Sequence, residues 1–231
     1  MSKDNKLSHI GFIMDGNGRW ATSRGLSRTQ GHKEGLKALE NLIKVLAEDS
    51  SVKQASFYCF STENWARPAL EVKTIMGLLK DFLKNDIEKL WQEGIQVKIK
   101  GDLSERSPFD DDLRKLLVSV NDKNLDEPKL IVNLCINYGG RDEIIRATNA
   151  LIAKGLEVNE ENLENEILEA DLPLDLVVRT SGEQRLSNFL LWQSAYAEFI
   201  FTDYHWPDIN AEKYAELKDS FFNRDRRFGK V

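Results

Sequence analysis

The chain has 231 residues, of which 41% are hydrophobic, so it can bury one sizeable core as a single domain. Its net charge of −6 argues against a nucleic acid or an anionic membrane surface as the main partner, because both favour a basic protein face. Two cysteines without metal-binding spacing, a polar N-terminus and the lack of a long apolar run predict a cytoplasmic protein without a membrane span.

Short apolar runs rich in β-branched residues alternate along the chain with longer stretches of helical period. This alternation is typical of βα units, so it predicts one α/β domain over residues 1–231 with a mainly parallel sheet. The expected strands are 9–15, 54–60, 95–101, 130–137, 175–180 and 199–201. The expected helices are 31–48, 70–92, 110–121, 141–154, 160–170 and 211–223.

Polar residues stand at the ends of four expected strands, namely Asp15, Ser61, Asn137 and Arg179. Loops are polar in general, and that explanation suffices for any one of these positions. The four together favour a single site, because open parallel sheets bind ligands at the carboxyl ends of their strands.

The segment 16–21 after the first strand fits the Gly-x-Gly-x-x-Ala form of the dinucleotide fingerprint. Three features oppose that interpretation. Asp15 would repel a pyrophosphate, Arg19 and Trp20 are bulky where a nucleotide fold needs close packing, and the next strand ends at Ser61 without an acid. A diphosphate site that contains a metal ion is the alternative.

In the diphosphate interpretation, Asp15 holds a divalent cation that bridges phosphate oxygens. The glycines and Asn17 allow backbone N–H groups to approach the anion at a helix N-terminus. Arginines add charge-assisted hydrogen bonds, and His32 contacts phosphate or moves a proton, although a lone helical histidine is often a surface group. The residues of this expected site are Asp15, Gly16, Asn17, Gly18, Arg19, Arg28 and His32.

The loop after the second strand is rich in hydrogen-bonding side chains. Ser61 or Thr62 could cap the following helix. Capping does not explain Asn64, Trp65 and Arg67 together, whereas a loop that orients an anion beside an apolar group needs such residues.

The loop after the fifth strand places two guanidinium groups and two hydroxyls around a glycine turn. Guanidinium binds phosphate in a bidentate way, which favours a second anion site at Arg179 and Arg185. Alternatively, these arginines pair with Glu183 and Glu198 in a structural ion network. Glu198 could also complete a metal site with Asp15.

Two further stretches have simpler explanations. The aspartates at 110–112 fit a helix N-terminus better than a metal-binding motif. The apolar residues of 70–91 cover more than one helix face, which indicates either deep burial or a wall of a hydrocarbon cavity.

These clusters, together with 137–141, 206–208 and 226–229, resemble the cis-prenyltransferase family, most closely the bacterial undecaprenyl diphosphate synthases. The similarity runs from about residue 9 to 229. It implies a six-stranded, mostly parallel sheet flanked by helices, a hydrophobic tunnel and a homodimer. It also implies a Mg²⁺-dependent condensation of isopentenyl diphosphate onto an allylic diphosphate such as farnesyl diphosphate, with a polyprenyl product, by default undecaprenyl diphosphate. A peripheral membrane contact for product release is a further expectation.

The resemblance also assigns roles to residues. It implies Asp15 and Asn64 as catalytic residues and Asp15 and Glu198 as metal ligands. It puts Trp20 with the allylic diphosphate site named above. The implied isopentenyl diphosphate site is Arg179, Arg185 and Ser187. The implied substrate-binding loop is Ser61, Thr62, Glu63, Asn64, Trp65, Arg67 and Glu71.

The chain departs from the family pattern in two places: it is short between 151 and 175, and Ile209 replaces a usual aromatic residue. A different class, a non-catalytic subunit of the same fold, would be expected to lose its acids and arginines. Here Asp15, Asn64, Arg179 and Arg185 are all present.

Overall fold

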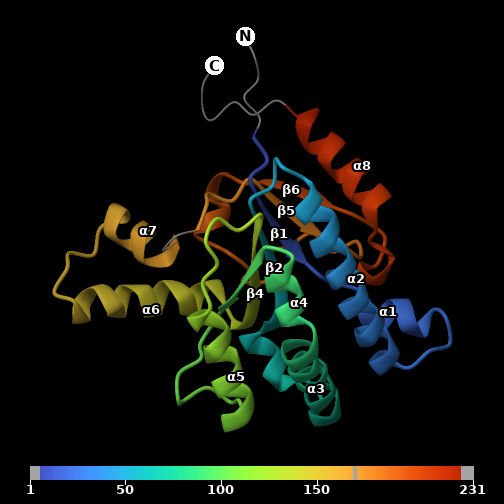
Figure 1. Ribbon diagram of the computed structural model, residues 1–231, viewed down its shortest axis with the longest axis horizontal. Coiled ribbons are helices and arrows are strands. Elements are labelled where there is room, and N and C mark those ends of the chain that lie inside the picture. Colours follow the sequence, from blue (N-terminus) through green and yellow to red (C-terminus); the bar gives the residue numbers. More distant parts are fainter. Residues whose placement is uncertain (1–5, 169–170, 225–231) are drawn as a thin grey trace.

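The computed structural model describes residues 6–168 and 171–224 (Figure 1). Six strands form one sheet in the order β3-β4-β2-β1-β5-β6, and every neighbouring pair is parallel. The expected six-stranded α/β fold is confirmed, and the sheet is parallel throughout. The strands are β1 (His9–Ile13), β2 (Gln54–Ser61), β3 (Ile95–Lys100), β4 (Leu130–Tyr138), β5 (Leu176–Arg179) and β6 (Glu198–Phe201).

The helices follow the expected alternation, with one break and several additions. The helix predicted over 70–92 is divided at Asp86 into two helices, and α1 and the short 3-10 segments were not predicted. The end of the helix expected over 160–170 lies outside the described residues. The helices are α1 (Asn17–Thr22), α2 (Arg28–Glu48), α3 (Ala69–Asn85), α4 (Ile87–Gln92), α5 (Asp111–Asp122), α6 (Gly140–Ala153), α7 (Glu160–Leu168) and α8 (Ala211–Phe222), and the 3-10 segments are η1 (Thr62–Ala66), η2 (Gln193–Tyr196) and η3 (Trp206–Asp208).

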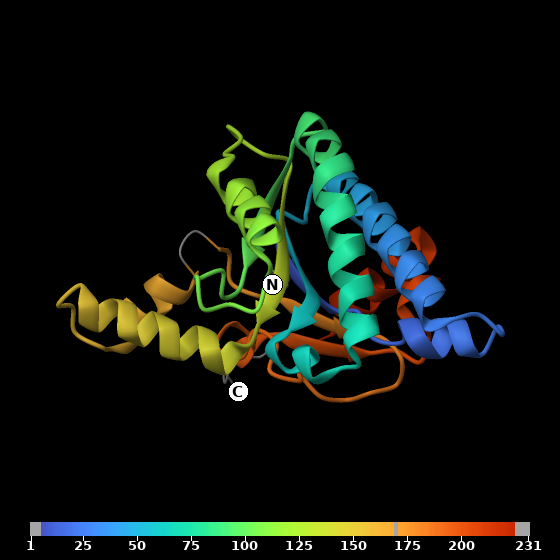
Figure 2. The ribbon, with the colours of Figure 1, turned by 90° about the horizontal axis from the view of Figure 1, so that it is seen from below.

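The main core lies on one face of the sheet, under α2, α3, α4, α5 and α8. Phe12 of β1 and Phe57 of β2 stack at 5.1 Å between ring centroids, beside the buried Leu42 of α2 and Phe82 of α3. Figure 2 shows α2 and α3 running side by side over this face. Alternate strand residues point here because successive side chains of a strand face opposite ways.

Helices α6 and α7 project from the body of the molecule (Figure 1, left) and pack on each other through Ala147, Leu151, Leu163 and Ile167. Ile145 and Ile152 of α6 are exposed. Within the part of the chain that the structure describes, no helix is both long and apolar enough to cross a membrane.

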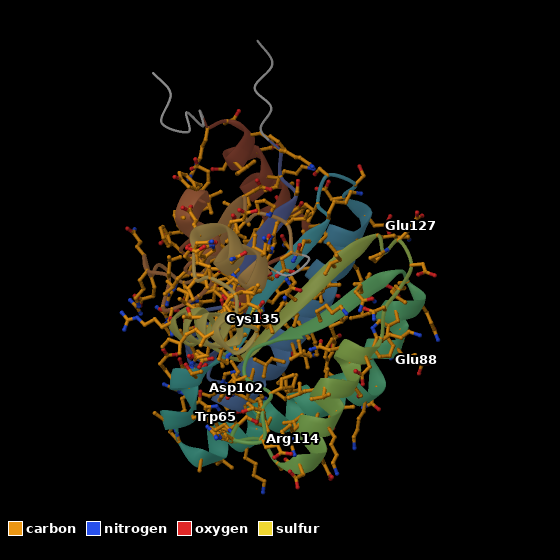
Figure 3. All side chains as sticks on the ribbon, turned by 90° about the vertical axis from the view of Figure 1, so that its left-hand side faces the viewer. Trp65, Glu88, Asp102, Arg114, Glu127 and Cys135 are labelled. Carbon is orange, nitrogen blue, oxygen red and sulfur yellow. The ribbon has the colours of Figure 1, made fainter. Side chains whose placement is uncertain are left out.

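The carboxyl ends of the strands meet at one edge of the sheet. Ile13 is level with Arg179, and Ser61 is level with Tyr138. Asp15, Ser61, Asn137 and Arg179 therefore gather at this edge, as the sequence predicts. Figure 3 shows the labelled Trp65 and Asp102 toward the same end of the molecule, and Glu127 at the opposite end.

Candidate active site

The loop after β1 turns sharply at Asp15 and leads into α1. The Asp15 amide donates to the Ile13 carbonyl at 2.9 Å, and Gly16 has a φ of 106°. A Cβ atom on Gly16 would lie 2.6 Å from Ser181 Oγ and 2.8 Å from His205 Nδ1. Only glycine fits, because the backbone conformation and the close neighbours both exclude a side chain.

Two arginines from different segments hold the Asp15 carboxylate. Arg179 Nη2 donates to Asp15 Oδ2 at 2.9 Å, and Arg19 Nη2 lies 3.3 Å from Oδ1. The Thr180 hydroxyl donates to the Asp15 backbone carbonyl at 2.6 Å. Burial alone would raise the pKa of Asp15, but the hydrogen bond and charge of Arg179, with the help of Arg19, outweigh burial and lower it. Asp15 is therefore an oriented carboxylate at neutral pH.

A pocket of about 370 Å³ opens in front of Asp15. It contains three arginines, one from α1, one from the start of α2 and one from the end of η1, an arrangement that suits an anion with several negative charges. Its second acid, Glu71, accepts a hydrogen bond from Arg67 Nη1 at 3.1 Å and lies 3.8 Å from Arg28 Nη1. The lining residues are Met14, Asp15, Gly16, Asn17, Gly18, Arg19, Arg28, His32, Arg67, Pro68 and Glu71.

One residue expected at this site, Trp20, is turned toward another partner. Its indole Nε1 donates to Asp208 Oδ1 at 2.7 Å, and the Arg24 guanidinium lies 4.5 Å from the centre of its ring. The structure thus ties Trp20 to η3, beside the pocket and not in its lining.

His32 of α2 lines the inner side of the pocket, with Nε2 3.3 Å from Glu71 Oε1. Burial lowers the pKa of His32, and Glu71 raises it. The charges of Arg67 and Arg28 lower the pKa again, and the net shift is downward. At pH 7 the imidazole is mostly neutral, so one ring nitrogen can donate and the other can accept.

A narrow apolar cavity of about 100 Å³ continues from the pocket between α2, α3 and the sheet. Met14, Asn17 and His32 belong to both spaces. Of the α3 residues only Phe82 and Leu83 are buried, and Ile75, Leu78 and Leu79 of the same helix line this cavity. The other wall residues are Gly35, Leu36, Leu39, Cys59, Ile75, Leu78, Leu79, Phe82, Leu134 and Trp206. A full tunnel stays a prediction.

The loop after β2 forms η1 and is fixed by the neighbouring loops. Asn64 Oδ1 accepts from the Ser61 amide at 3.1 Å, so Asn64 takes part in a capping box, which leaves Trp65 and Arg67 unexplained by capping. Trp65 Nε1 donates to Asn137 Oδ1, and Asn137 Nδ2 donates to the Asp102 carbonyl, each at 2.8 Å. The loops after β2 and β3 are thereby held to the end of β4.

Arg179 connects the first pocket to the loop after β5. Its side chain is only 5% exposed, and Nη1 donates to Ser187 Oγ at 2.8 Å, while Nη2 holds Asp15. Arg185 is largely exposed and forms an ion pair with Glu183. Arg185 thus has one of the ion pairs that the structural-network alternative supposed, and its place in an anion site stays a prediction, whereas Arg179 links Asp15 with Ser187.

A second pocket, of about 510 Å³, brings the β2 and β5 loops together. Asn64 and Ser187 both line this pocket, and both belong to the active site that the sequence predicts. Arg67 and Glu71, from the same sequence cluster as Asn64, lie in the first pocket instead. The lining residues of the second pocket are Ser61, Glu63, Asn64, Arg141, Ser187, Asn188 and Leu191.

The expected contact between Asp15 and Glu198 is not present within the chain. Glu198 begins β6, and its partner in the register, Leu176, begins β5. That level lies three residues before the pair Ile13 and Arg179, roughly 10 Å along the strands at about 3.3 Å per residue. Arg224 Nη1 donates to Glu198 Oε2 at 2.9 Å. Glu198 therefore lies toward the opposite end of the sheet.

Asp15 is the residue best placed to hold a divalent cation. Among the described residues, no group of three histidine, cysteine or acidic side chains is arranged around a metal position. The Arg19 guanidinium lies 3.3 Å from Asp15 and 3.5 Å from Glu183. Glu183 is therefore another acid near Asp15, in addition to Glu71 of the pocket lining. One or two carboxylates fit Mg²⁺ that takes its remaining ligands from water and phosphate.

Sequence reasoning missed three contributors to the site. Ser181 Oγ lies 2.6 Å from His205 Nδ1, under Gly16, and no motif pointed to His205. Arg141 and Asn188 line the second pocket, although both stood in segments that the sequence singled out. Two sequence features could have pointed to them: Arg141 directly follows a pair of glycines, and Asn188 lies in the loop that contains Arg185. The motif at 226–229 lies outside the described residues.

Comparison with known proteins agrees with this geometry. Residues 13–229 match the prenyltransferase family model described as "Putative undecaprenyl diphosphate synthase". The chain is 43% identical to the ditrans,polycis-undecaprenyl-diphosphate synthase ((2E,6E)-farnesyl-diphosphate specific) of Buchnera aphidicola, covering all of this chain and 94% of that one.

Two solved structures share the fold. A probable undecaprenyl diphosphate synthase from Campylobacter jejuni matches with a TM-score of 0.82 and 38% identity, over 98% of this chain and 100% of that one. Lavandulyl diphosphate synthase from Lavandula x intermedia, in complex with dimethylallyl diphosphate, matches with a TM-score of 0.87 and 28% identity, over 99% and 100% of the two chains.

Proposed function

The chain belongs to the undecaprenyl diphosphate synthase family of prenyltransferases, and on this premise we propose that it condenses isopentenyl diphosphate onto an allylic diphosphate. The observation that carries the proposal is the position of Arg179. This buried guanidinium donates to Asp15, which lines the first pocket, and to Ser187, which lines the second, so one side chain links the two pockets. An apolar cavity begins at the first pocket.

The allylic substrate occupies the first pocket, with its diphosphate against Arg19, Arg28 and Arg67 and its hydrocarbon in the cavity. The polar pocket and the apolar cavity share Met14, Asn17 and His32, which gives one molecule room for both parts. Isopentenyl diphosphate occupies the second pocket, where Ser187 and Asn64 lie. This division follows from the cavity, which adjoins only one of the two pockets among the described residues.

Breaking the allylic C–O bond requires neutralisation of the departing diphosphate. The arginines of the first pocket supply positive charge, and their positions are fixed before substrate binds because carboxylates hold them. When bound at Asp15, Mg²⁺ would supply further positive charge that neutralises the diphosphate oxygens. The apolar wall shields the developing allylic cation from water.

Condensation then depends on holding the second double bond near the allylic carbon, which is a matter of positioning. Afterwards a proton must leave the new chain. The mostly neutral His32 at the first pocket or an oxygen of the substrate diphosphate can accept this proton, and Asn64 at the second pocket can assist by a hydrogen bond. Repetition of these steps makes a polyprenyl diphosphate.

Farnesyl diphosphate is the proposed primer and undecaprenyl diphosphate the proposed product. The support is the specificity in the name of the Buchnera relative, together with 43% identity across the whole of this chain. The cavity of about 100 Å³ must widen to hold such a product.

We also propose a cytoplasmic homodimer that touches a membrane peripherally to release its product. Exposed apolar residues on and after α6 and at the end of η2 support a self-association surface: Ile145, Ile152, Leu156, Val158 and Tyr196. Static light scattering of the full chain tests the dimer: a single mass near 26.5 kDa would contradict it.

The central experiment incubates the purified protein with labelled isopentenyl diphosphate and allylic primers of several lengths, with and without Mg²⁺. Chromatography of the dephosphorylated products measures their length. Metal-dependent chain growth is expected, and Asp15→Ala should abolish most of it. If no primer is elongated, the proposed function is wrong. If Asp15→Ala retains near-full turnover, the role of Asp15 is wrong.

Two other functions make different predictions. A dinucleotide oxidoreductase would bind NAD or NADP in a titration, whereas this enzyme should not. A non-catalytic subunit would bind no diphosphate. The ion pair between Asp15 and Arg179 favours a working site over that alternative.

A further inference from the structure

Arg141 lines the second pocket together with Asn64 and Ser187. It lies in the first turn of α6, and the residue is exposed. Each arginine that lines the first pocket has a carboxylate within ion-pair distance. Within residues 6–168 and 171–224, no such carboxylate lies beside the Arg141 guanidinium. Its charge is therefore available to an incoming anion.

The position of Arg141 is fixed by Asn188, from the loop after β5. Asn188 Oδ1 accepts from the Arg141 amide at 2.9 Å, and the Asn188 carbonyl accepts from the Gly140 amide at 2.7 Å. Asn188 Nδ2 donates to Glu63 Oε1 at 2.9 Å. Asn188 thus joins three loops, and it does so with a φ of 67°, which is unfavourable for a side-chain-bearing residue.

The same contacts show which group of α6 meets a ligand. The amides of Gly140 and Arg141 at the start of the helix already donate to Asn188. A Cβ atom on Gly139 would lie 2.6 Å from Asn188 Nδ2, so the backbone approaches this side chain closely. The Arg141 side chain is consequently the cationic group that this turn presents to the pocket.

Charge balance favours an anion beside Ser187. Arg179 donates to Ser187 from the inner side, but its charge is neutralised by Asp15. Glu63 is the acid in the pocket lining, and its hydrogen bonds, including that from Asn188, outweigh burial and lower its pKa. Arg141 is the basic residue in the lining of this pocket, so a diphosphate beside Ser187 would find its positive charge there.

We propose that Arg141 is a further binding residue for the diphosphate of isopentenyl diphosphate. The inference rests on the proposed function, whose second pocket it completes. A guanidinium suits this role because its planar set of donors can bind two phosphate oxygens at once.

The test is Arg141→Gln in the full chain. We expect the KM for isopentenyl diphosphate to rise about tenfold, which corresponds to about 1.4 kcal/mol, with little change in the KM for the allylic primer. Arg141→Lys should recover part of the loss. The control is Arg146→Gln, because Arg146 lies on the same helix and pairs with Asp142 at 2.6 Å. It should leave both KM values unchanged.

Calorimetric titration with isopentenyl diphosphate separates this inference from the proposed function. If the wild-type protein elongates primers but Arg141→Gln binds isopentenyl diphosphate as tightly as the wild type, the role of Arg141 is refuted and the function stands. If no primer is elongated, the function fails, and the titration still decides whether Arg141 contributes to binding.

Discussion

Arg179 Nη2 and Asp15 Oδ2 are 2.9 Å apart, and this ion pair joins the loop after β1 to the end of β5. Asp15 can therefore present its carboxylate in one orientation before any substrate or metal ion arrives. The pair also sets the ionisation of the site, because Arg179 is the largest of the influences that lower the pKa of Asp15.

The first prediction concerns the pH dependence that this pair creates. Because the pKa of Asp15 is lowered by folding, the stability that its carboxylate contributes is fully present above the unfolded-state pKa of about 3.9. This stability is lost as the pH falls through the pKa of the folded state. Arg179→Gln removes the opposing charge, leaves the burial, and should raise the pKa of Asp15. The acidic limb of the kcat/KM profile should then move to higher pH.

The matched variant is Arg185→Gln, because Arg185 pairs with Glu183 and not with Asp15. It should raise the KM for isopentenyl diphosphate without moving the acidic limb. An acidic limb that stays in place in Arg179→Gln would show that Asp15 does not control it.

The second prediction concerns His32 and its acidic neighbour. Glu71 raises the pKa of His32 against burial, so Glu71→Gln should lower that pKa further. Titration of the imidazole resonances by NMR measures it directly, because the chain has only three histidines. Glu63→Gln, in the other pocket, serves as the control. A rise in the His32 pKa in Glu71→Gln would show that Glu71 does not raise the pKa of His32 in the wild-type protein.

The third prediction compares two helical glycines. A Cβ atom on Gly31 of α2 would lie 2.1 Å from the Asn17 carbonyl oxygen, whereas one on Gly77 of α3 would meet nothing within 4 Å. Gly31→Ala should displace the turn at Asn17 and raise the KM for the allylic primer at least tenfold. Gly77→Ala should stabilise the protein by about 0.5–1 kcal/mol through helix propensity.

Urea denaturation and steady-state kinetics on both glycine variants check this comparison. Equal effects of the two substitutions on the allylic KM would show that the close approach of α1 to α2 is unimportant for binding.

The fourth prediction concerns the apolar cavity. Leu79 lines it, so Leu79→Trp should fill much of the space of about 100 Å³ and shorten the product. Leu70→Trp adds the same ring at a position that is 77% exposed and outside the lining. Product lengths from the two variants are compared by chromatography, and unchanged length in Leu79→Trp would rule out this cavity as the chain-holding space.

Much of the site followed from strand ends alone. Asp15, Ser61, Asn137 and Arg179 were placed together correctly because parallel strands bring their carboxyl ends to one edge. The same rule explains the error at Glu198. That residue precedes the predicted strand 199–201, and it lies toward the other end of the sheet for that reason.

Other features depend on contacts between distant segments, which local sequence does not encode. The division of the predicted helix at Asp86 coincides with no glycine or proline, so helix signals gave no warning. Asn188 caps α6 from 47 positions away, and the Ser181 contact with His205 joins two irregular segments. Trp20 was assigned to the pocket by resemblance, and its bond to Asp208 became visible only in three dimensions.

The division between α3 and α4 bears on how a growing chain is accommodated. Helix α3 is anchored by Phe82 and Leu83 close to Asp86, while its earlier turns remain only partly covered. Each added C5 unit that leaves water gains roughly 4 kcal/mol at about 0.8 kcal/mol per carbon. A gain of this size would favour an outward tilt of α3 during elongation. Chain growth should end where the elastic cost of further tilting exceeds the free energy gained by burying another C5 unit. The stiffness of α3, as well as the length of the cavity wall it forms, should therefore help to determine the length of the product.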